Sequence, residues 1–247
     1  MQFTPVLLYH RGRHSILDEM KRILIIAGHY GSGKTEFSVN LAVYAARNGA
    51  FGYTRTAIAD MDVVNPYFRS RERGDLLAGL GVTVYGSFYG GSVTAEIPEV
   101  SAEVRAPLED RETFVIVDAG GNETGARVMK PFAKYFTRED AAMYIVLNAS
   151  RPETRTVSGA LSHITAIESE LGFKAEGLIS NTHLLRETTA SDVLRGYRLC
   201  LEVGRAADIP PACVCYPAGI VDGAELTGIE APLMPLTLYM RDSWLDK

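Results

Sequence analysis

The chain has 247 residues, of which 47% are hydrophobic, and a formal net charge of −5. This size and composition predict a globular, soluble protein with a sizeable core, and the acidic balance argues against nucleic-acid binding through a broadly basic surface. Three cysteines make no disulfide framework and fit a cytoplasmic location, and no apolar run is long enough to span a membrane.

Residues 1–19 precede the first predicted strand. Their apolar stretch, VLLY, is too short for a signal-peptide core, and the basic residues of HRGRH follow it rather than precede it. We interpret this segment as a flexible N-terminal arm, with a docking arm for a partner as the alternative.

A strand, a glycine-rich loop and a helix are predicted in succession. Residues 23–27 are apolar, and residues 36–47 carry apolar side chains at helical spacing. The loop between them, GHYGSGKT, fills the phosphate-loop pattern G-x-x-x-x-G-K-[ST]. Such a loop turns its N–H groups inward at a helix N-terminus, where negative charge is favoured. The expected nucleotide-binding residues here are Gly28, His29, Tyr30, Gly31, Ser32, Gly33, Lys34, Thr35 and Glu36.

Two side chains of this loop have expected roles in phosphoryl chemistry. Lys34 would reach the β- and γ-phosphates, and the Thr35 hydroxyl would bind Mg²⁺. A chance glycine-rich turn is the alternative interpretation, which the surrounding strand and helix disfavour.

The second predicted strand, residues 56–59, delivers Asp60 and Asp62 at its carboxyl end, where ligands bind in doubly wound sheets. A carboxylate on a loop at this edge can orient a water in line with the γ-phosphate, and Asp62 is our candidate. The nearby arginines are interpreted as solvated surface in preference to phosphate contacts; they are Arg55, Arg69, Arg71 and Arg73.

A third strand is predicted at residues 82–85, followed by a glycine-rich turn at 86–91. Residues 95–110, rich in Glu and Pro, are expected to cross the surface. The next strand, residues 113–118, ends in an aspartate as a Walker B strand does, so Asp118 would hold Mg²⁺ through a water and Gly121 would offer its N–H to the γ-phosphate. A buried strand followed by a helix cap is the alternative for this pattern on its own.

The rest of the chain repeats strand and helix signals. Strands are predicted at 142–147, 177–180 and 212–216, and helices at 152–171 and 188–207. The loop after the last of these strands leads to a short C-terminal segment. The expected fold class is α/β, a three-layer P-loop NTPase with a mostly parallel, doubly wound sheet flanked by helices.

Three segments resemble the MinD/ParA group of P-loop ATPases. HYGSGKT resembles that group's deviant Walker A loop, K-G-G-x-G-K-T, and FVIVDAGGNETGARVM is similar to its D-S-P-A-G-I-E-T-G-A stretch. YPAGIVDGAELTGIEAP resembles its proline-led loop near the adenine. The resemblance covers residues 21–234. The sequence shows no linker and no internal repeat, so we expect a single P-loop nucleotide-binding domain over residues 20–247.

The Asp60-Met61-Asp62 element also resembles that group's D-x-D after the second strand, and the resemblance implies several residue roles. It implies that Asp62 positions the attacking water, that Asp60 supports the Mg²⁺ and Lys34 region, that Asn181 reads the base, and that Pro217 lies near the adenine. Asn181 is followed by Thr-His-Leu and so lacks the lysine and aspartate of the guanine-specific N-K-x-D element, which favours ATP over GTP.

One position departs from the group. Its signature lysine, which reaches across a nucleotide-sandwich dimer, falls at His29, and histidine is a weaker fixed cation. Either His29 only hydrogen-bonds the loop, or another cation substitutes. The candidates for substitution are Arg69, Arg71, Arg73, Arg151 and a charge supplied by a partner.

Other chemistry is less favoured. The thiols of Cys213 and Cys215 would face the same side of a strand, where burial is favoured over a Zn²⁺ or iron–sulfur site shared by a homodimer. The five histidines show no ligand spacing. The C-terminal stretch LTLYMRDSWLDK lacks the basic face of a membrane anchor.

The leading functional hypothesis is a molecular switch that depends on ATP and Mg²⁺ and hydrolyses ATP slowly without a partner. The switch would form a nucleotide-dependent homodimer and act on an unidentified protein client. Maturation of a metal centre is one such role. The alternatives are an ATP-dependent ligase or kinase similar to dethiobiotin synthetase or cobyrinic-acid amidating enzymes, and a regulator with little turnover. The ligase would need a substrate pocket, for which Tyr85, Phe88 and Tyr89 are candidates.

Overall fold

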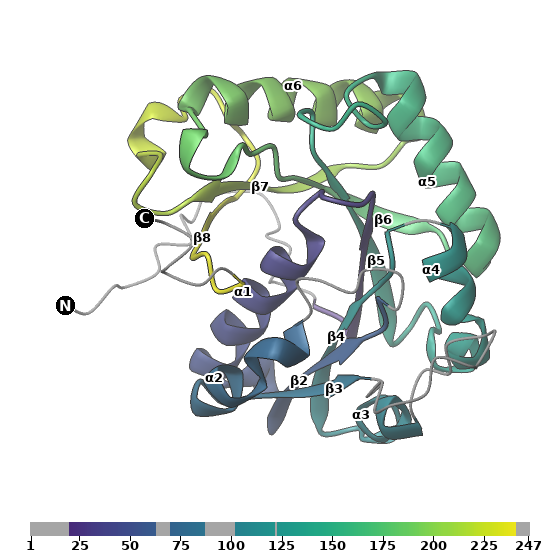
Figure 1. The fold of residues 1–247 in the computed structure, drawn as a ribbon. Coiled ribbons are helices and arrows are strands. Elements are labelled where there is room, and N and C mark those ends of the chain that lie inside the picture. The colour runs from purple at the N-terminus through teal and green to yellow at the C-terminus, as the bar shows by residue number, and fades with distance from the viewer. Residues whose placement is uncertain (1–19, 63–69, 87–101, 122, 241–247) are drawn as a thin grey trace.

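The structure is a computed structural model that describes residues 20–62, 70–86, 102–121 and 123–240 (Figure 1). Its sheet has eight strands in the order β3-β2-β4-β1-β5-β6-β7-β8, and every neighbouring pair is parallel. The strands are β1 Ile23–Gly28, β2 Arg55–Asp60, β3 Val82–Gly86, β4 Thr113–Asp118, β5 Ala141–Leu147, β6 Ala175–Ser180, β7 Pro211–Pro217 and β8 Leu233–Leu236. The predicted α/β fold class is confirmed.

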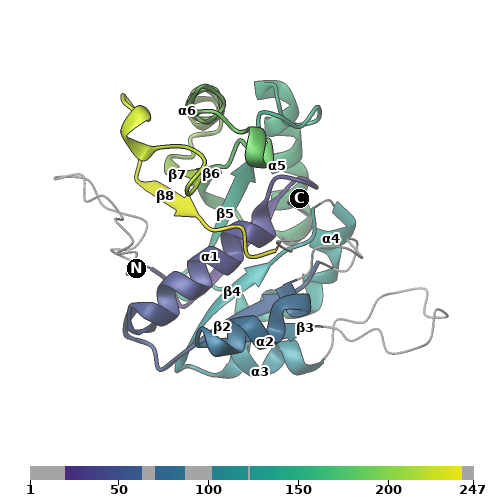
Figure 2. The same cartoon turned by 60° about the vertical axis from the view of Figure 1, so that its left-hand side comes forward.

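Helices cover both faces of this sheet (Figure 2). Side chains of α1 and α2 pack on one face, and those of α3, α5 and α6 pack on the other. The described helices are α1 Lys34–Arg47, α2 Gly74–Gly79, α3 Arg105–Glu109, α4 Glu123–Val128, α5 Val157–Leu171 and α6 Ala190–Ala207. No helix among the described residues is long and apolar enough to cross a membrane.

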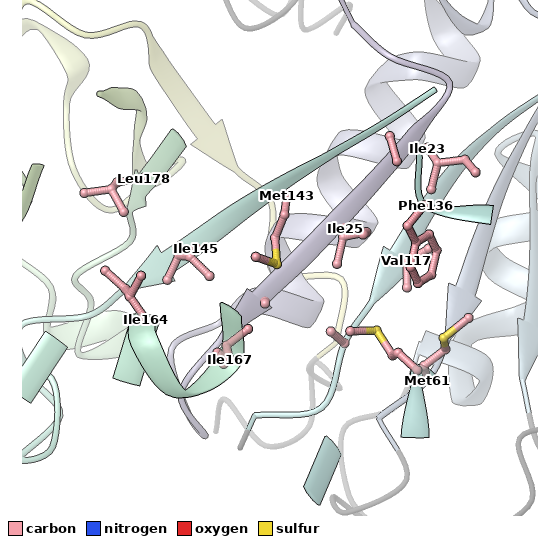
Figure 3. Close-up of a cluster of buried hydrophobic side chains, with 14 of the residues drawn as sticks. Ile23, Ile25, Met61, Val117, Phe136, Met143, Ile145, Ile164, Ile167 and Leu178 are labelled. Atoms are coloured by element: carbon pink, nitrogen blue, oxygen red, sulfur yellow. The ribbon is translucent and has the colours of Figure 1, made fainter. Parts of the chain in front are cut away.

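The central strand β1 is buried along its whole length because helices cover both of its faces. Ile23 and Ile25 pack in the core on the α5 side, while Leu24 and Ile26 pack on the α1 side. Figure 3 shows the first of these cores, in which β1 and β5 side chains meet Ile164 and Ile167 of α5. The alternation explains why the strand reads as one continuous apolar run.

Two predicted helix starts are wrong. The helix predicted from residue 152 begins at Val157, because the Thr156 side chain caps it by accepting the N–H of Gly159 and the preceding residues form turns. The helix predicted from residue 188 begins at Ala190, where Thr189 and Asp192 form a capping box. In both helices the cap residue has an extended backbone and its side chain satisfies an N–H of the first turn that has no helical partner, so the helix begins at the next residue.

The segments around α3 and β8 also differ from the prediction. Residues 102–109 form a 3₁₀ turn and α3, and Val104 and Leu108 are buried in the core rather than crossing the surface. The short C-terminal segment contains β8, which pairs with β7 through the register Val214 to Leu233. The predicted arm 1–19, the residues 87–91 of the glycine-rich turn and residues 95–101 lie outside the described residues.

Candidate active site

The phosphate loop joins β1 to α1 at the carboxyl edge of the sheet. Gly31 and Gly33 adopt left-handed backbone angles, with φ of 72° and 82°, and a Cβ on Gly33 would lie 2.4 Å from the Asn181 Nδ2 atom. Gly33 is also the N-cap residue of α1 and, being glycine, has no side chain to cap that helix end. The first N–H groups of α1 therefore have no cap to satisfy them, which is the arrangement that binds an anion.

A cavity of about 340 Å³ lies against this loop. It is bordered by the loop, by residues that follow β6, by the end of β7 and by the C-terminal segment after β8. The lining residues are Tyr30, Gly31, Gly33, Lys34, Thr35, Glu36, Arg151, Asn181, His183, Leu185, Pro217, Leu236, Leu238 and Met240. The structure thus brings most of the predicted nucleotide-binding residues to one cavity; Gly28, His29, Ser32 and Gly121 are not among its lining residues.

Asp60 and Asp62 lie on the same side of the chain because Met61 between them is fully buried in the core on the α5 side (Figure 3). Asp62 forms an ion pair with Lys34, with 2.7 Å between the Lys34 Nζ and Asp62 Oδ2 atoms and only 5% of either side chain exposed. The N–H of Asp62 donates to the Asp60 carboxylate at 3.2 Å. The predicted catalytic residues Lys34 and Asp60 therefore both contact Asp62.

Asp118 sits beside Asp60 in the register of the parallel strands β4 and β2. Burial raises the pKa of Asp118 to about 7, and the negative charges of Asp60 and Asp62 add to this rise, while Lys34 and the Thr35 hydroxyl oppose it. Its Oδ1 atom is buried without a hydrogen-bond partner in the described part of the chain. A hydroxyl and an unsatisfied carboxylate oxygen beside a phosphate loop are hard oxygen ligands, so the residues present fit Mg²⁺.

Asn181 braces the phosphate loop. Its Nδ2 donates to the Ser32 carbonyl at 2.9 Å, and its side chain also lines the cavity. Its amide nitrogen is thus engaged by the loop, whereas the resemblance implies a role in reading the base.

The C-terminal segment closes one wall of the cavity, and no sequence signal identified that wall. The Glu36 carboxylate accepts the N–H of Tyr239 at 2.6 Å and that of Met240 at 3.3 Å. Asn40 exchanges hydrogen bonds of 2.8 Å with the backbone of Thr237. Figure 2 shows this yellow segment crossing α1. Glu36, predicted as a phosphate-loop residue, therefore holds the wall of the cavity.

His29 is hydrogen-bonded within the loop, with 3.0 Å between its Nδ1 atom and the Tyr30 carbonyl oxygen. Its ring packs edge-on against His163 of α5, with 5.2 Å between ring centroids. Burial lowers the pKa of His163 to about 4, and the neighbouring His29 and Lys34 contribute to the decrease. These contacts favour the interpretation in which His29 hydrogen-bonds the loop.

The arginine candidates separate by position. Arg55 pairs with Asp110 and Glu112 at the start of β2, on the opposite edge of the sheet from the cavity, so it is a surface residue as predicted. Arg151 lines the cavity, and its Nε donates to the Gly31 carbonyl at 2.8 Å. Arg69 and the Arg71 side chain lie outside the described part of the structure.

All three cysteines are buried. Cys213 and Cys215 pack in the core on the α1 side, as predicted for apolar filling. Burial raises the pKa of Cys200 to about 12 and that of Cys215 as well, which keeps both thiols protonated. Among the described residues, no group of three or more His, Cys, Asp or Glu side chains could hold a metal ion.

No protein-family model matches this chain, and no curated protein matches it significantly. Solved structures are similar. The signal recognition particle 54 kDa protein of Aeropyrum pernix, in complex with GDP, has a TM-score of 0.53 and 24% identity over 81% of this chain and 43% of its own. The cell division protein FtsY of Thermotoga maritima has a TM-score of 0.52 and 19% identity over 83% of this chain and 65% of its own.

The chain has a P-loop NTPase fold. It spans less than two thirds of the length of either solved protein. At these identities the likeness establishes the fold alone, so the nucleotide, the reaction and the partner are argued from this chain's own residues.

Proposed function

We propose that the chain binds ATP with Mg²⁺ and hydrolyses it as a molecular switch of the MinD/ParA type. The observation that carries this proposal is that one phosphate loop borders both a cavity suited to a base and, through Lys34, a buried cluster of carboxylates that includes Asp62 and Asp118. Each of the three sequence segments that resemble the MinD/ParA group contributes a residue here, namely Lys34, Asp118 and Pro217.

The lining of the cavity supports adenine over guanine. Recognition of guanine calls for a carboxylate that accepts its ring and amino N–H groups, as in the N-K-x-D element. Glu36 is the one carboxylate among the described lining residues, and it accepts the N–H groups of Tyr239 and Met240. The remaining wall is formed largely by apolar side chains, namely Leu185, Pro217, Leu236, Leu238 and Met240, against which an adenine ring packs without a paired carboxylate.

Binding of a triphosphate would exchange one partner of Lys34. Lys34 is paired with Asp62. If its ammonium moves to the β- and γ-phosphates, the Asp62 carboxylate loses this ion pair at the same edge of the sheet. A released carboxylate there can orient a water toward the γ-phosphate. The Thr35 hydroxyl and, through a water, Asp118 would hold Mg²⁺, which would neutralise charge on the phosphates.

The output of the switch is a nucleotide-dependent homodimer that acts on a protein client. Tyr30 supports a partner over the mouth of the site, because it lines the cavity and is still 58% exposed. Leu184, next to the lining residues His183 and Leu185, is 46% exposed. Large apolar side chains at the rim of a site are typical of surfaces that another protein covers.

The test is phosphate release together with light scattering on a sizing column, for wild type and Asp62→Ala, each with ADP·Mg²⁺ and with ATP·Mg²⁺. We expect slow release by wild type, no release by Asp62→Ala, and a dimer trapped by ATP only in the variant. Normal hydrolysis by Asp62→Ala would overturn the catalytic assignment. A monomer in every condition would overturn the dimer.

A further inference from the structure

The phosphate loop has a second fixed cation beside it, in addition to Lys34. We propose that Arg151 supplies, from within the same chain, the positive charge that meets the γ-phosphoryl group of the nucleotide. This inference rests on the proposed function and names the residue that takes the place of the group's signature lysine. The position of that lysine is held by His29, which does not line the cavity.

The sheet topology brings Arg151 to the loop. β5 pairs in parallel with β1, with Val146 opposite Gly28, so the segment that follows β5 emerges beside the loop that follows β1. The Arg151 Nε donates to the Gly31 carbonyl at 2.8 Å. A Cβ on Gly31 would lie 2.7 Å from the Arg151 Cζ atom, so the guanidinium rests directly on a position that only glycine can fill.

A closed turn holds Arg151 in this place. Asn148, which is fully buried, accepts the N–H of Ser150 on its side chain at 2.8 Å and the N–H of Arg151 on its carbonyl at 3.1 Å. The buried Thr154 hydroxyl donates to the same carbonyl at 3.0 Å. Outside the turn, Arg195 donates to the Ala149 carbonyl at 2.9 Å. A charge fixed before substrate arrives stabilises a transition state without reorganisation.

The charge of Arg151 is available to a ligand. Within the described part of the chain its side chain has one hydrogen bond, through Nε, and neither Nη atom donates to a protein group. Arg22 and Arg55, by contrast, are each paired with an aspartate. Arg151 lines the cavity, and a guanidinium offers a fork of donors that suits phosphate oxygens.

The position along the loop assigns Arg151 to the γ end of the nucleotide. Asn181 and His183 lie against Gly33 on the side of the base cavity. Gly121, the predicted γ-phosphate donor, lies against the other end of the loop, where a Cβ on it would be 2.8 Å from the Tyr30 backbone nitrogen. The Arg151 guanidinium lies against Gly31, which is next to Tyr30 in the chain. It therefore lies near the end of the loop that Gly121 contacts.

The experiment compares Arg151→Ala, Arg151→Gln and Arg151→Lys with the control Arg155→Ala. Arg155 is exposed on the same segment and does not line the cavity. We measure ATP hydrolysis at saturating ATP·Mg²⁺ and the affinity for ADP. The expected result is a fall in kcat of about 100-fold for Ala and Gln, a recovery of about tenfold by Lys, and a change in ADP affinity of less than about threefold. The control should match wild type.

Several outcomes would overturn the inference. Gln keeps a donor for the Gly31 carbonyl but has no charge, so wild-type turnover in Arg151→Gln would assign Arg151 to bracing the loop. An equal loss of ADP binding and turnover in Arg151→Ala would also mean a structural role. Unchanged turnover in Arg151→Ala overturns this inference alone, whereas a wild-type chain that binds no ATP overturns the proposed function itself.

Discussion

The two ends of the candidate site are built in different ways. The base end is formed by apolar side chains and by polar groups that are already hydrogen-bonded within the protein. Glu36 and Asn40, for example, accept N–H groups of the C-terminal backbone. The carboxylate end crowds Asp60, Asp62 and Asp118 around one lysine, and a buried Asp118 oxygen has no partner within the described residues.

This difference indicates at which end nucleotide binding must rearrange the side-chain contacts. A preformed apolar wall can receive a ring without rearrangement, because its polar groups are satisfied by the protein. A cluster of buried carboxylates gains stability when a cation enters, because negative charge concentrated in a buried site is costly. Substitutions at the carboxylate end should therefore affect chemistry most, and those at the base end should affect affinity.

The largest expected effect is that of Lys34→Ala. Removing the ammonium should lower ATP affinity by more than about 100-fold, since the contact with phosphate is charge-assisted. Equilibrium binding of a fluorescent ATP analogue measures this. Because the substitution removes the ion-pair partner of the buried Asp62 carboxylate, the double variant Lys34→Ala/Asp62→Asn serves as the folding control. Tight ATP binding by the double variant would contradict the role of Lys34.

Asp118→Asn should separate stability from activity. The Asp118 carboxylate is fully buried and its pKa is raised to about 7 by burial, so at pH 8 a neutral side chain of the same shape should raise the melting temperature. The same change should lower Mg²⁺-dependent phosphate release about 100-fold, because a metal ligand is lost. Thermal unfolding and phosphate release on one preparation decide this. A variant that melts lower yet hydrolyses ATP normally would refute both parts.

Glu36→Gln tests the base end. The carboxylate accepts two backbone N–H groups of the C-terminal segment, and weakening charge-assisted hydrogen bonds costs about 1.4 kcal/mol, which is a tenfold loss. We expect ATP affinity to fall about tenfold with kcat nearly unchanged. Glu202→Gln, on the exposed surface of α6, is the matched control. A fall in kcat without a change in ATP affinity would contradict the prediction that the base end affects affinity and the carboxylate end affects chemistry.

The smallest effect concerns acid stability. Burial, with the neighbouring His29 and Lys34, lowers the pKa of His163 from 6.5 to about 4, so the unfolded chain binds a proton in this range and the folded chain does not. The contribution of neutral His163 to the free energy of unfolding is fully present above pH 6.5 and falls by up to about 3 kcal/mol between pH 6.5 and pH 4. His163→Gln should lose less stability than wild type on acidification over that interval, as measured by urea unfolding. Parallel losses in the two proteins would disprove this contribution.

The local motifs were predictable from sequence, whereas the contacts between distant segments that border the site were not. The strand, loop and helix around Lys34, and the two carboxylate-bearing strand ends, depend on neighbouring residues and periodicity, so the sequence predicted the fold class and the elements that hold most of the site. The register of β1 with β5, which places Arg151 on Gly31, and the contact of Glu36 with Tyr239 join segments far apart in the chain. No spacing rule connects such pairs, and the β8 strand was missed for the same reason.

Calorimetric titration of the wild-type chain with ATP and with GTP, each in the presence of Mg²⁺, tests whether this site binds ATP. ATP in excess EDTA and the Lys34→Ala variant are the comparisons. We predict ATP binding that weakens in EDTA, GTP binding at least about tenfold weaker, and no heat from Lys34→Ala. Equal or tighter binding of GTP would contradict the adenine assignment, and binding that persists in Lys34→Ala would contradict the site.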